Sequence, residues 1–294
     1  MNILEAVAAF IGFYLVAILI HEIGHIIGAL IGGIKVKWLS WMCFLFILDN
    51  GFKVRIIPFQ HISGGAVMPN HEEKSIDAFS KKKSGLILFT LFGPLVSLLC
   101  FLMFFFVNNF LCTLFACANM IVFMVTMIGT DGRVIEKYVK SDLYILHVFL
   151  LVCLQKKDTE ENKIIVKETI DFCLNKLLKK DNLDINGLKI LHMSLFINEA
   201  MEIKDERIDK LVNSLVEKDD KNNIEYKNLK HNILNFYYAF NGQREKVTSP
   251  IEKSLQIILN KDIKSYQELL NKVSKVPFVQ DSFLFKASER IIYL

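Results

Sequence analysis

Long apolar runs and short polar breaks divide the first half of the chain. Three runs are long enough for helices that cross a bilayer, which takes about 20 mostly apolar residues: 3–34, 85–107 and 110–130. A fourth run, residues 143–154, is short for a span and predicts a buried or interfacial helix. The pattern therefore predicts a membrane helix core with three to four spans.

The segment between the first two spans has a different pattern. Residues 35–70 are rich in aromatic and β-branched side chains, and Asn50-Gly51 marks a turn between two apolar stretches. This predicts strands or a hairpin near the membrane surface, that is, a small membrane-associated β element. The polar residues 70–84 that follow predict a loop.

The second half of the chain has the three- and four-residue apolar spacing of amphipathic helices. Turn signals such as Asn186-Gly187 separate these helices. The predicted helices are residues 163–180, 185–203, 205–218, 227–240, 249–261 and 265–276. We interpret them as α-hairpins, and the segment from Asn228 to Leu259 is weakly similar to one tetratricopeptide-type unit.

Composition supports the division into two halves. Hydrophobic residues make up 52% of the chain, which excludes a disordered protein. Residues 1–155 carry 20 charged side chains, whereas residues 156–294 carry 46. The predicted fold is mainly α, with a membrane-embedded domain at 1–155 and a soluble all-α helical-hairpin domain at 156–294. The net charge of +4 is modest and gives no indication of nucleic-acid binding.

Basic residues orient the predicted spans, because cytosolic loops of membrane proteins are enriched in lysine and arginine. The stretch 35–83 and the residues after 130 carry such charges, whereas the turn at 108–109 carries none. We therefore expect a multi-pass protein of the cell membrane with an outside N-terminus and a cytoplasmic C-terminal domain. In this topology, the later part of the first span and the end of the third span both lie toward the cytosol.

Candidate chemistry lies in the first span. His21, Glu22 and His25 form an HExxH motif, and residues i and i+4 share one helix face, so both imidazoles can bind one Zn²⁺. Glu22 is adjacent and is the candidate catalytic base. Each ionisable group in a membrane helix costs roughly 2.5–3.5 kcal/mol, and a bound metal would offset that cost. We therefore expect one zinc ion per chain rather than a polar patch without a metal.

A catalytic zinc usually has three protein ligands, so another element must supply the third. Asp131 follows the third span and precedes Gly132, and the topology permits it to reach the two histidines. Asp131 is therefore the candidate third ligand. His61, His71 and His147 are weaker rivals, because the first two lie in polar loop sequence and the third lies on a short apolar helix.

The arrangement of these motifs resembles the site-2 protease family of intramembrane zinc metalloproteases. Four segments are similar to motifs of that family and stand in the same order: HEIGH at 21–25, ISGGAVMP at 62–69, FGPLVSLL at 92–99 and TDGR at 130–133. Two features depart from the family pattern. No Asn and Pro stand just before the Asp-Gly pair, and Ser97 stands where the family often has Asn. The chain therefore resembles a divergent, compact bacterial member.

The resemblance implies a role for each matching residue. His21, His25 and Asp131 would be the zinc ligands, and Glu22 would be the general base toward a zinc-activated water. Gly64 and Gly65 would belong to a membrane-associated strand whose edge could bind an extended substrate peptide, although a turn is an equally good interpretation of this pair.

Two functional hypotheses from different classes follow. The first is an intramembrane zinc metalloendopeptidase that cleaves a membrane-anchored protein or peptide near the cytosolic face of the bilayer. The alternative is a catalytically inactive membrane scaffold, and the missing Asn and Pro motivate it. In either case the helices of 156–294 are expected to bind a protein partner or a second copy of the chain. A transporter is disfavoured because three or four spans without paired repeats offer little for alternating access.

Overall fold

The chain divides into two compact units, Met1–Asp142 and Leu143–Leu294. Residues 143–155, which the sequence grouped with the spans, belong to the second unit. The structure is a computed structural model. It describes residues 2–49, 51–56, 65–217 and 223–248, and the single positions 264, 265, 268, 282, 286 and 287.

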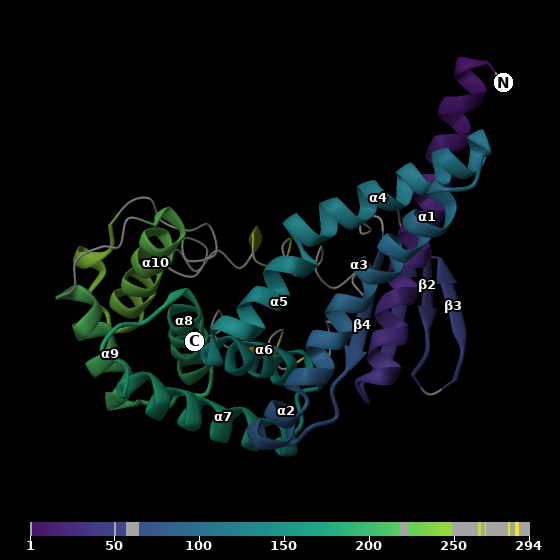
Figure 1. The fold of residues 1–294 in the computed structure, drawn as a ribbon. Helices are drawn as coiled ribbons and strands as arrows, with labels where there is room; N and C mark the ends of the chain where they lie inside the picture. The colour runs from purple at the N-terminus through teal and green to yellow at the C-terminus, as the bar shows by residue number, and fades with distance from the viewer. Residues whose placement is uncertain are drawn as a thin grey trace. The chain divides into compact units, whose positions relative to one another are not determined.

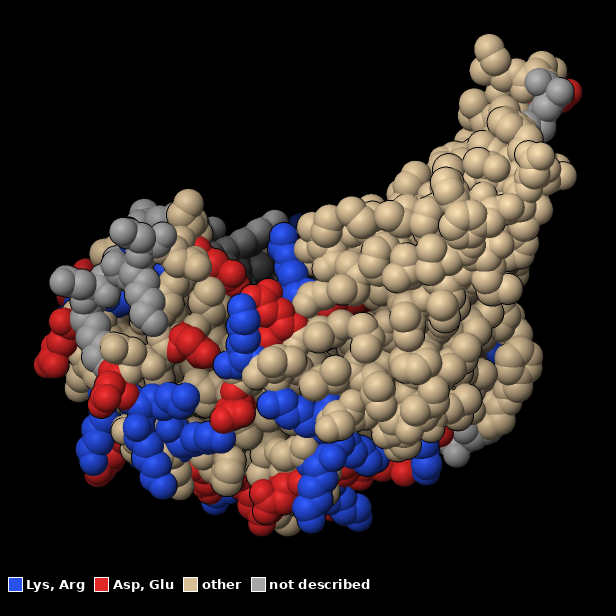
Figure 2. Space-filling view, viewed as in Figure 1, with Lys and Arg blue, Asp and Glu red and all other residues tan. Residues whose placement is uncertain are grey.

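The first unit is built on long apolar helices that lie side by side (Figure 1). They are α1 (Ile3–Ile31), α3 (Lys83–Phe105) and α4 (Phe110–Gly129), and the short, charged helix α5 (Asp131–Lys140) follows α4. Within the described ranges, three stretches are long and apolar enough to cross a membrane: α1, α3, and α4 continued by α5. They correspond to the three predicted spans. Figure 2 shows few charged side chains on the face that these helices present to the viewer, as a lipid-facing surface requires.

A line of glycines brings α1 and α3 into contact. Gly24, Gly28 and Gly32 recur every fourth residue on α1. A methyl group at Gly28 would lie 2.5 Å from the carbonyl oxygen of Leu88, and one at Gly24 would lie 2.6 Å from that of Phe92. Membrane helices that approach so closely gain van der Waals contact along their backbones, which is how small residues spaced by four associate helices in lipid. This contact fixes the position of the HExxH segment against α3.

The helical path bends where α4 meets α5. Only Thr130 separates the two helices, so Asp131 is the first residue of α5 rather than part of a turn that ends the span. A methyl group at Gly132 would lie 1.8 Å from the carbonyl oxygen of Met127. The bend therefore depends on a residue without a side chain at position 132, and it directs Asp131 inward.

Four strands form an antiparallel sheet in the order β3-β2-β1-β4. The strands are β1 (Lys35–Trp41), β2 (Phe44–Ile47), β3 (Lys53–Ile56) and β4 (Gly65–Asn70). Gly51 has a φ of +104°, which favours glycine, and Ile47 pairs with Lys53 across the turn, so the predicted hairpin is confirmed. The indole Nε1 of Trp41 donates to the carbonyl oxygen of Leu15 at 2.9 Å and attaches the sheet to α1.

The prediction of a loop throughout 70–84 was wrong at both ends and in the middle. Asn70 ends β4, six residues form the short helix α2 (Ile76–Lys81), and Lys83 and Ser84 begin α3. The Ser75 side chain accepts a hydrogen bond from the amide of Ala78 and caps this helix. Just before it, the carboxylate of Glu73 is buried and forms an ion pair with Lys82. This pair ties the end of β4 to the start of α3.

The described part of the second unit is helical, and the predicted helices before residue 249 are all present. The helices are α6 (Asp142–Gln155), α7 (Glu160–Leu178), α8 (Ile185–Ala200), α9 (Glu206–Val216) and α10 (Ile224–Phe240). Arg207 links two of them, because it bonds Asp205 at the start of α9 and both Asp171 and Asn175 on α7. The predicted helix at 249–261 and most of that at 265–276 lie outside the described residues, as does the second half of the tetratricopeptide-type segment.

Candidate metal centre

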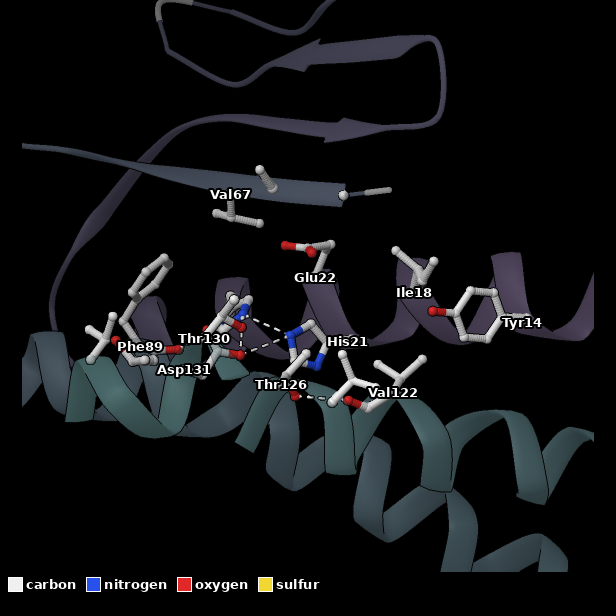
Figure 3. A pocket seen from close by; sticks show the side chains of 16 residues that line it. Tyr14, Ile18, His21, Glu22, Val67, Phe89, Val122, Thr126, Thr130 and Asp131 are labelled. Carbon is white, nitrogen blue, oxygen red and sulfur yellow. Dashed lines mark hydrogen bonds and ion pairs between the residues drawn. The ribbon is translucent and has the colours of Figure 1, made fainter. Parts of the chain in front are cut away.

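Two imidazoles of α1 meet edge to face in the interior of the first unit. His21 and His25 are 3% and 6% exposed, and their Nε2 atoms lie 3.1 Å apart (Figure 3). The four-residue spacing places them on one face of the helix, and the glycine line holds that face against α3. Two buried nitrogen atoms this close can share one proton or one metal ion.

Asp131 completes this cluster from the start of α5. Its Oδ2 lies 3.1 Å from Nε2 of His21 and 3.6 Å from Nε2 of His25. Oδ2 is buried and, within the described residues, has no hydrogen-bond donor unless an imidazole carries a proton on Nε2. Three lone-pair atoms therefore converge on one point, and a cation there would satisfy all of them.

The donor set and its spacing fit zinc. Ligand bonds of 2.0–2.2 Å in a tetrahedron place ligand atoms roughly 3.3–3.5 Å apart, and the three distances in this cluster bracket that range. Two imidazole nitrogens with one carboxylate oxygen are a common catalytic zinc set, and they leave a fourth position open. Among the described residues, His21, His25 and Asp131 are the group of three whose ligand atoms lie within 4.8 Å of one another.

Helix α3 contributes polar contacts to the other side of both imidazoles. Nδ1 of His25 lies 2.8 Å from the carbonyl oxygen of Phe89, which can only accept, so this nitrogen carries the proton and Nε2 presents its lone pair. Nδ1 of His21 lies 3.3 Å from Oγ of Ser97. Metal-binding histidines characteristically donate their second nitrogen in this way. No sequence pattern marks a backbone carbonyl or a lone serine in an apolar helix, so neither contact was predicted.

Glu22 lines the same cavity and points from α1 toward β4 (Figure 3). It is 6% exposed. A methyl group at Gly65 would lie 2.7 Å from Cγ of Glu22 and 2.8 Å from its Oε1. Gly65 therefore leaves the space that the Glu22 carboxylate occupies. Gly64, the other candidate substrate-binding residue, lies outside the described residues.

The cavity has a volume of about 460 Å³ and is mostly apolar. Beyond the cluster and Glu22, its polar side chains are hydroxyls, those of Tyr14, Thr90, Thr126 and Thr130. Its walls come from five elements, α1, α3, α4, α5 and β4. A polar reaction centre thus lies next to a surface that suits apolar side chains.

Of the rival histidines, His71 lies away from this cluster. Nδ1 of His71 lies 3.7 Å from Oε2 of Glu73, beyond the end of β4. His147 belongs to the second unit, and His61 lies outside the described residues. Asp131 is therefore the sequence-derived candidate that the fold brings to the two histidines.

Comparisons with known proteins give one match. The family model described as peptidase family M50 matches residues 9–280, which is most of the chain. No curated protein and no solved structure matches the chain significantly.

Proposed function

Because the chain belongs to peptidase family M50, we propose that it is a zinc-dependent intramembrane endopeptidase with its active site at His21, Glu22, His25 and Asp131. The membership confirms the resemblance to the site-2 protease family and implies an intramembrane metalloprotease. Zinc is the metal of this family in general. A scaffold without catalytic activity is not favoured. The observation that carries the proposal is the convergence of three lone-pair atoms beside a buried glutamate.

His21, His25 and Asp131 would hold the metal through Nε2, Nε2 and Oδ2. When bound there, zinc would supply Lewis-acid polarisation of a peptide carbonyl and would make water more acidic. The carboxylate of Asp131 would offset part of the charge of a bound metal, and the two neutral imidazoles would add no charge of their own. Burial strengthens these electrostatic interactions, because the surrounding helices exclude bulk water.

Glu22 would move the proton in this reaction. It accepts a proton from the attacking water, the water oxygen bonds to the carbonyl carbon, and the proton passes to the leaving amine as the C–N bond breaks. Its place beside His21 and inside the cavity supports this role. Gly65 supports it as well, since any side chain at that position would occupy the space of the carboxylate.

Strand β4 would bind the substrate peptide. Among the described residues β4 pairs only with β1, so its other edge presents backbone groups, and Gly65, Ala66 and Val67 line the cavity. A transmembrane helix must unwind before its carbonyls can react, and pairing with a strand edge replaces the hydrogen bonds that unwinding removes. The apolar walls favour a membrane-embedded or membrane-adjacent segment.

The distribution of basic residues supports cleavage near the cytosolic face. Lysines and arginines gather before α3 and after α4, at the ends of the spans that carry the cluster. We therefore infer an outside N-terminus, a cluster toward the cytosol, and a soluble cytoplasmic domain at residues 156–294. That domain would bind a protein partner or a second copy of the chain.

Replacing Glu22 by Gln tests the proposal, because the amide keeps the shape of the side chain and cannot accept the proton. Membrane peptides from cells that express full-length wild type or Glu22→Gln would be compared by proteomics, with zinc content measured on both purified proteins. We expect one zinc per chain in both, and at least about 100-fold slower release of cleaved peptides from the variant.

Glu136→Gln is the matched control, because Glu136 is an exposed carboxylate of α5 outside the cavity. It should leave the peptide pattern of the wild type intact. Equal cleavage by wild type and Glu22→Gln, or wild-type protein purified from zinc-supplemented cells without zinc, would sink the proposed function.

A further inference from the structure

Helix α3 supports both histidines through one line of residues. Phe89, Gly93 and Ser97 are spaced by four, so they lie along one face of the helix. The carbonyl oxygen of Phe89 contacts His25, and Oγ of Ser97 contacts His21. Between them, a methyl group at Gly93 would lie 2.5 Å from Nε2 of His25. The absence of a side chain at Gly93 thus leaves room for the two imidazoles. Phe89 and Ser97, one turn away on either side, provide the polar contacts of these imidazoles.

The Ser97 hydroxyl contacts two groups. It is fully buried, and its Oγ lies 3.4 Å from the carbonyl oxygen of Gly93, which can only accept. When the hydroxyl proton is donated to that carbonyl, the serine oxygen is free to accept. The contact of 3.3 Å between Oγ and Nδ1 of His21 can then run from the imidazole N–H to the serine oxygen.

We propose that Ser97 is a positioning residue that holds the proton of His21 on Nδ1 and thereby sets the metal affinity of the site. With the proton on Nδ1, Nε2 of His21 presents its lone pair toward Oδ2 of Asp131 and Nε2 of His25. Without Ser97, the tautomer of neutral His21 with its proton on Nε2 would be more stable. In that tautomer Nε2 donates a hydrogen bond to Oδ2 of Asp131, which lies 3.1 Å away. That tautomer cannot bind a metal through Nε2. This inference rests on the proposed function only for the identity of the metal.

The test measures zinc affinity and tautomer rather than proteolysis. Full-length protein in detergent is stripped with a chelator and titrated with zinc against a chromophoric competitor. Side-chain nitrogen NMR of ¹⁵N-histidine-labelled, metal-free protein reports which nitrogen of His21 carries the proton, with His21→Gln used to assign the signals. We expect Ser97→Ala to weaken zinc binding about 10–100-fold and to move the proton of His21 to Nε2.

Two further variants separate this role from packing. Thr169→Val removes a buried hydroxyl of α7, one that donates to the carbonyl of Ile165 in its own helix and does not line the cavity, and it should keep the zinc affinity and tautomer of the wild type. Ser97→Thr restores the hydroxyl and should recover most of the affinity that Ser97→Ala loses.

The inference is overturned if Ser97→Ala keeps both the affinity and the tautomer of the wild type, or if Thr169→Val loses as much affinity as Ser97→Ala. If the wild type binds no zinc, the proposed function fails by itself. The tautomer of His21 in the metal-free proteins then still decides the role of Ser97.

Discussion

Oδ2 of Asp131 lies 3.1 Å from Nε2 of His21, although one residue starts α5 and the other belongs to α1. Both groups lie in helices that are long and apolar enough to cross a membrane, where a carboxylate without a partner is costly. The glycine line of α1 and the bend before α5 bring them together. The fold therefore brings two imidazoles and a carboxylate of these helices to one point, and this convergence is the main physical argument for a metal.

Replacing Asp131 by Asn should weaken zinc binding by about 100-fold or more. The amide keeps the shape of the side chain but removes the negative charge and the strongest oxygen donor of the cluster. Zinc affinity of the stripped, full-length protein, measured against a competing chelator, checks this. Asp142→Asn is the control, because Asp142 is an exposed carboxylate whose Oδ1 lies 3.8 Å from Nζ of Lys83. Unchanged affinity in Asp131→Asn would show that Asp131 is not a ligand.

Gly132→Ala should disturb the metal centre without changing any ligand. Its methyl group would lie 1.8 Å from the carbonyl oxygen of Met127, so the bend between α4 and α5 must open and carry Asp131 with it. We expect about tenfold or greater loss of zinc affinity, because ligand atoms tolerate little displacement. Gly129→Ala, three residues earlier with nothing within 4 Å of its added methyl group, should bind zinc as the wild type does. Equal affinities for the two variants would contradict this account of the bend.

The clustering of His21, His25 and Asp131 could be predicted because each of these residues carries a signal in the sequence. HExxH has a fixed helical spacing, and a lone carboxylate beside a glycine after an apolar run is conspicuous. The supports of the cluster could not be found in the same way. Ser97 is one small polar residue within an apolar run. The contact from Phe89 is made by its backbone carbonyl, a group that every residue has. Their roles follow from the packing of α1 against α3, which only the three-dimensional structure gives.

The helices and the hairpin could be predicted from local sequence, whereas the pairing of distant strands could not. Helices follow from local periodicity, so α7 to α10 begin and end within a few residues of their predicted bounds. The hairpin at Gly51 follows from its turn residues. The pairing of β4 with β1 was not predicted, because strand partners distant in sequence leave no local mark. The four-residue spacing of Gly24, Gly28 and Gly32 is a local pattern that favours close helix packing in membranes, although it does not name the partner helix.

Gly28→Ala should destabilise the first unit. The added methyl group would lie 2.5 Å from the carbonyl oxygen of Leu88 and 2.8 Å from Cβ of Phe92, so α1 and α3 must separate. Overpacking of this kind costs about 1–3 kcal/mol, which should lower the apparent melting temperature in detergent by several degrees. Gly12→Ala on the same helix meets nothing within 4 Å and should melt at or above the wild-type temperature, since alanine favours helix. If the two variants melt alike, the glycine line does not hold these helices together.

The buried ion pair at Glu73 predicts an acid-sensitive contribution to stability. Burial alone would raise the pKa of Glu73, but the hydrogen bond from the ammonium of Lys82 and the nearby imidazole of His71 outweigh it, so the pKa lies below its usual value. A carboxylate with a depressed pKa stabilises the fold above its unfolded pKa and loses this contribution as the pH falls through the folded pKa. The contribution should therefore be complete at pH 7 and decline progressively below about pH 5.

Glu73→Gln isolates this effect, because the amide cannot titrate. The variant should be less stable than the wild type at pH 7 by about 1 kcal/mol, and the difference should shrink as the pH falls below about 5, measured by thermal melts of metal-free protein. Glu72→Gln removes the neighbouring carboxylate, which is exposed and pairs with Lys35 at the surface. Solvent screens that pair, so this control should melt as the wild type does at every pH. A constant difference between wild type and Glu73→Gln from pH 7 to pH 4 would mean that the ionised carboxylate does not stabilise the end of β4 against α3.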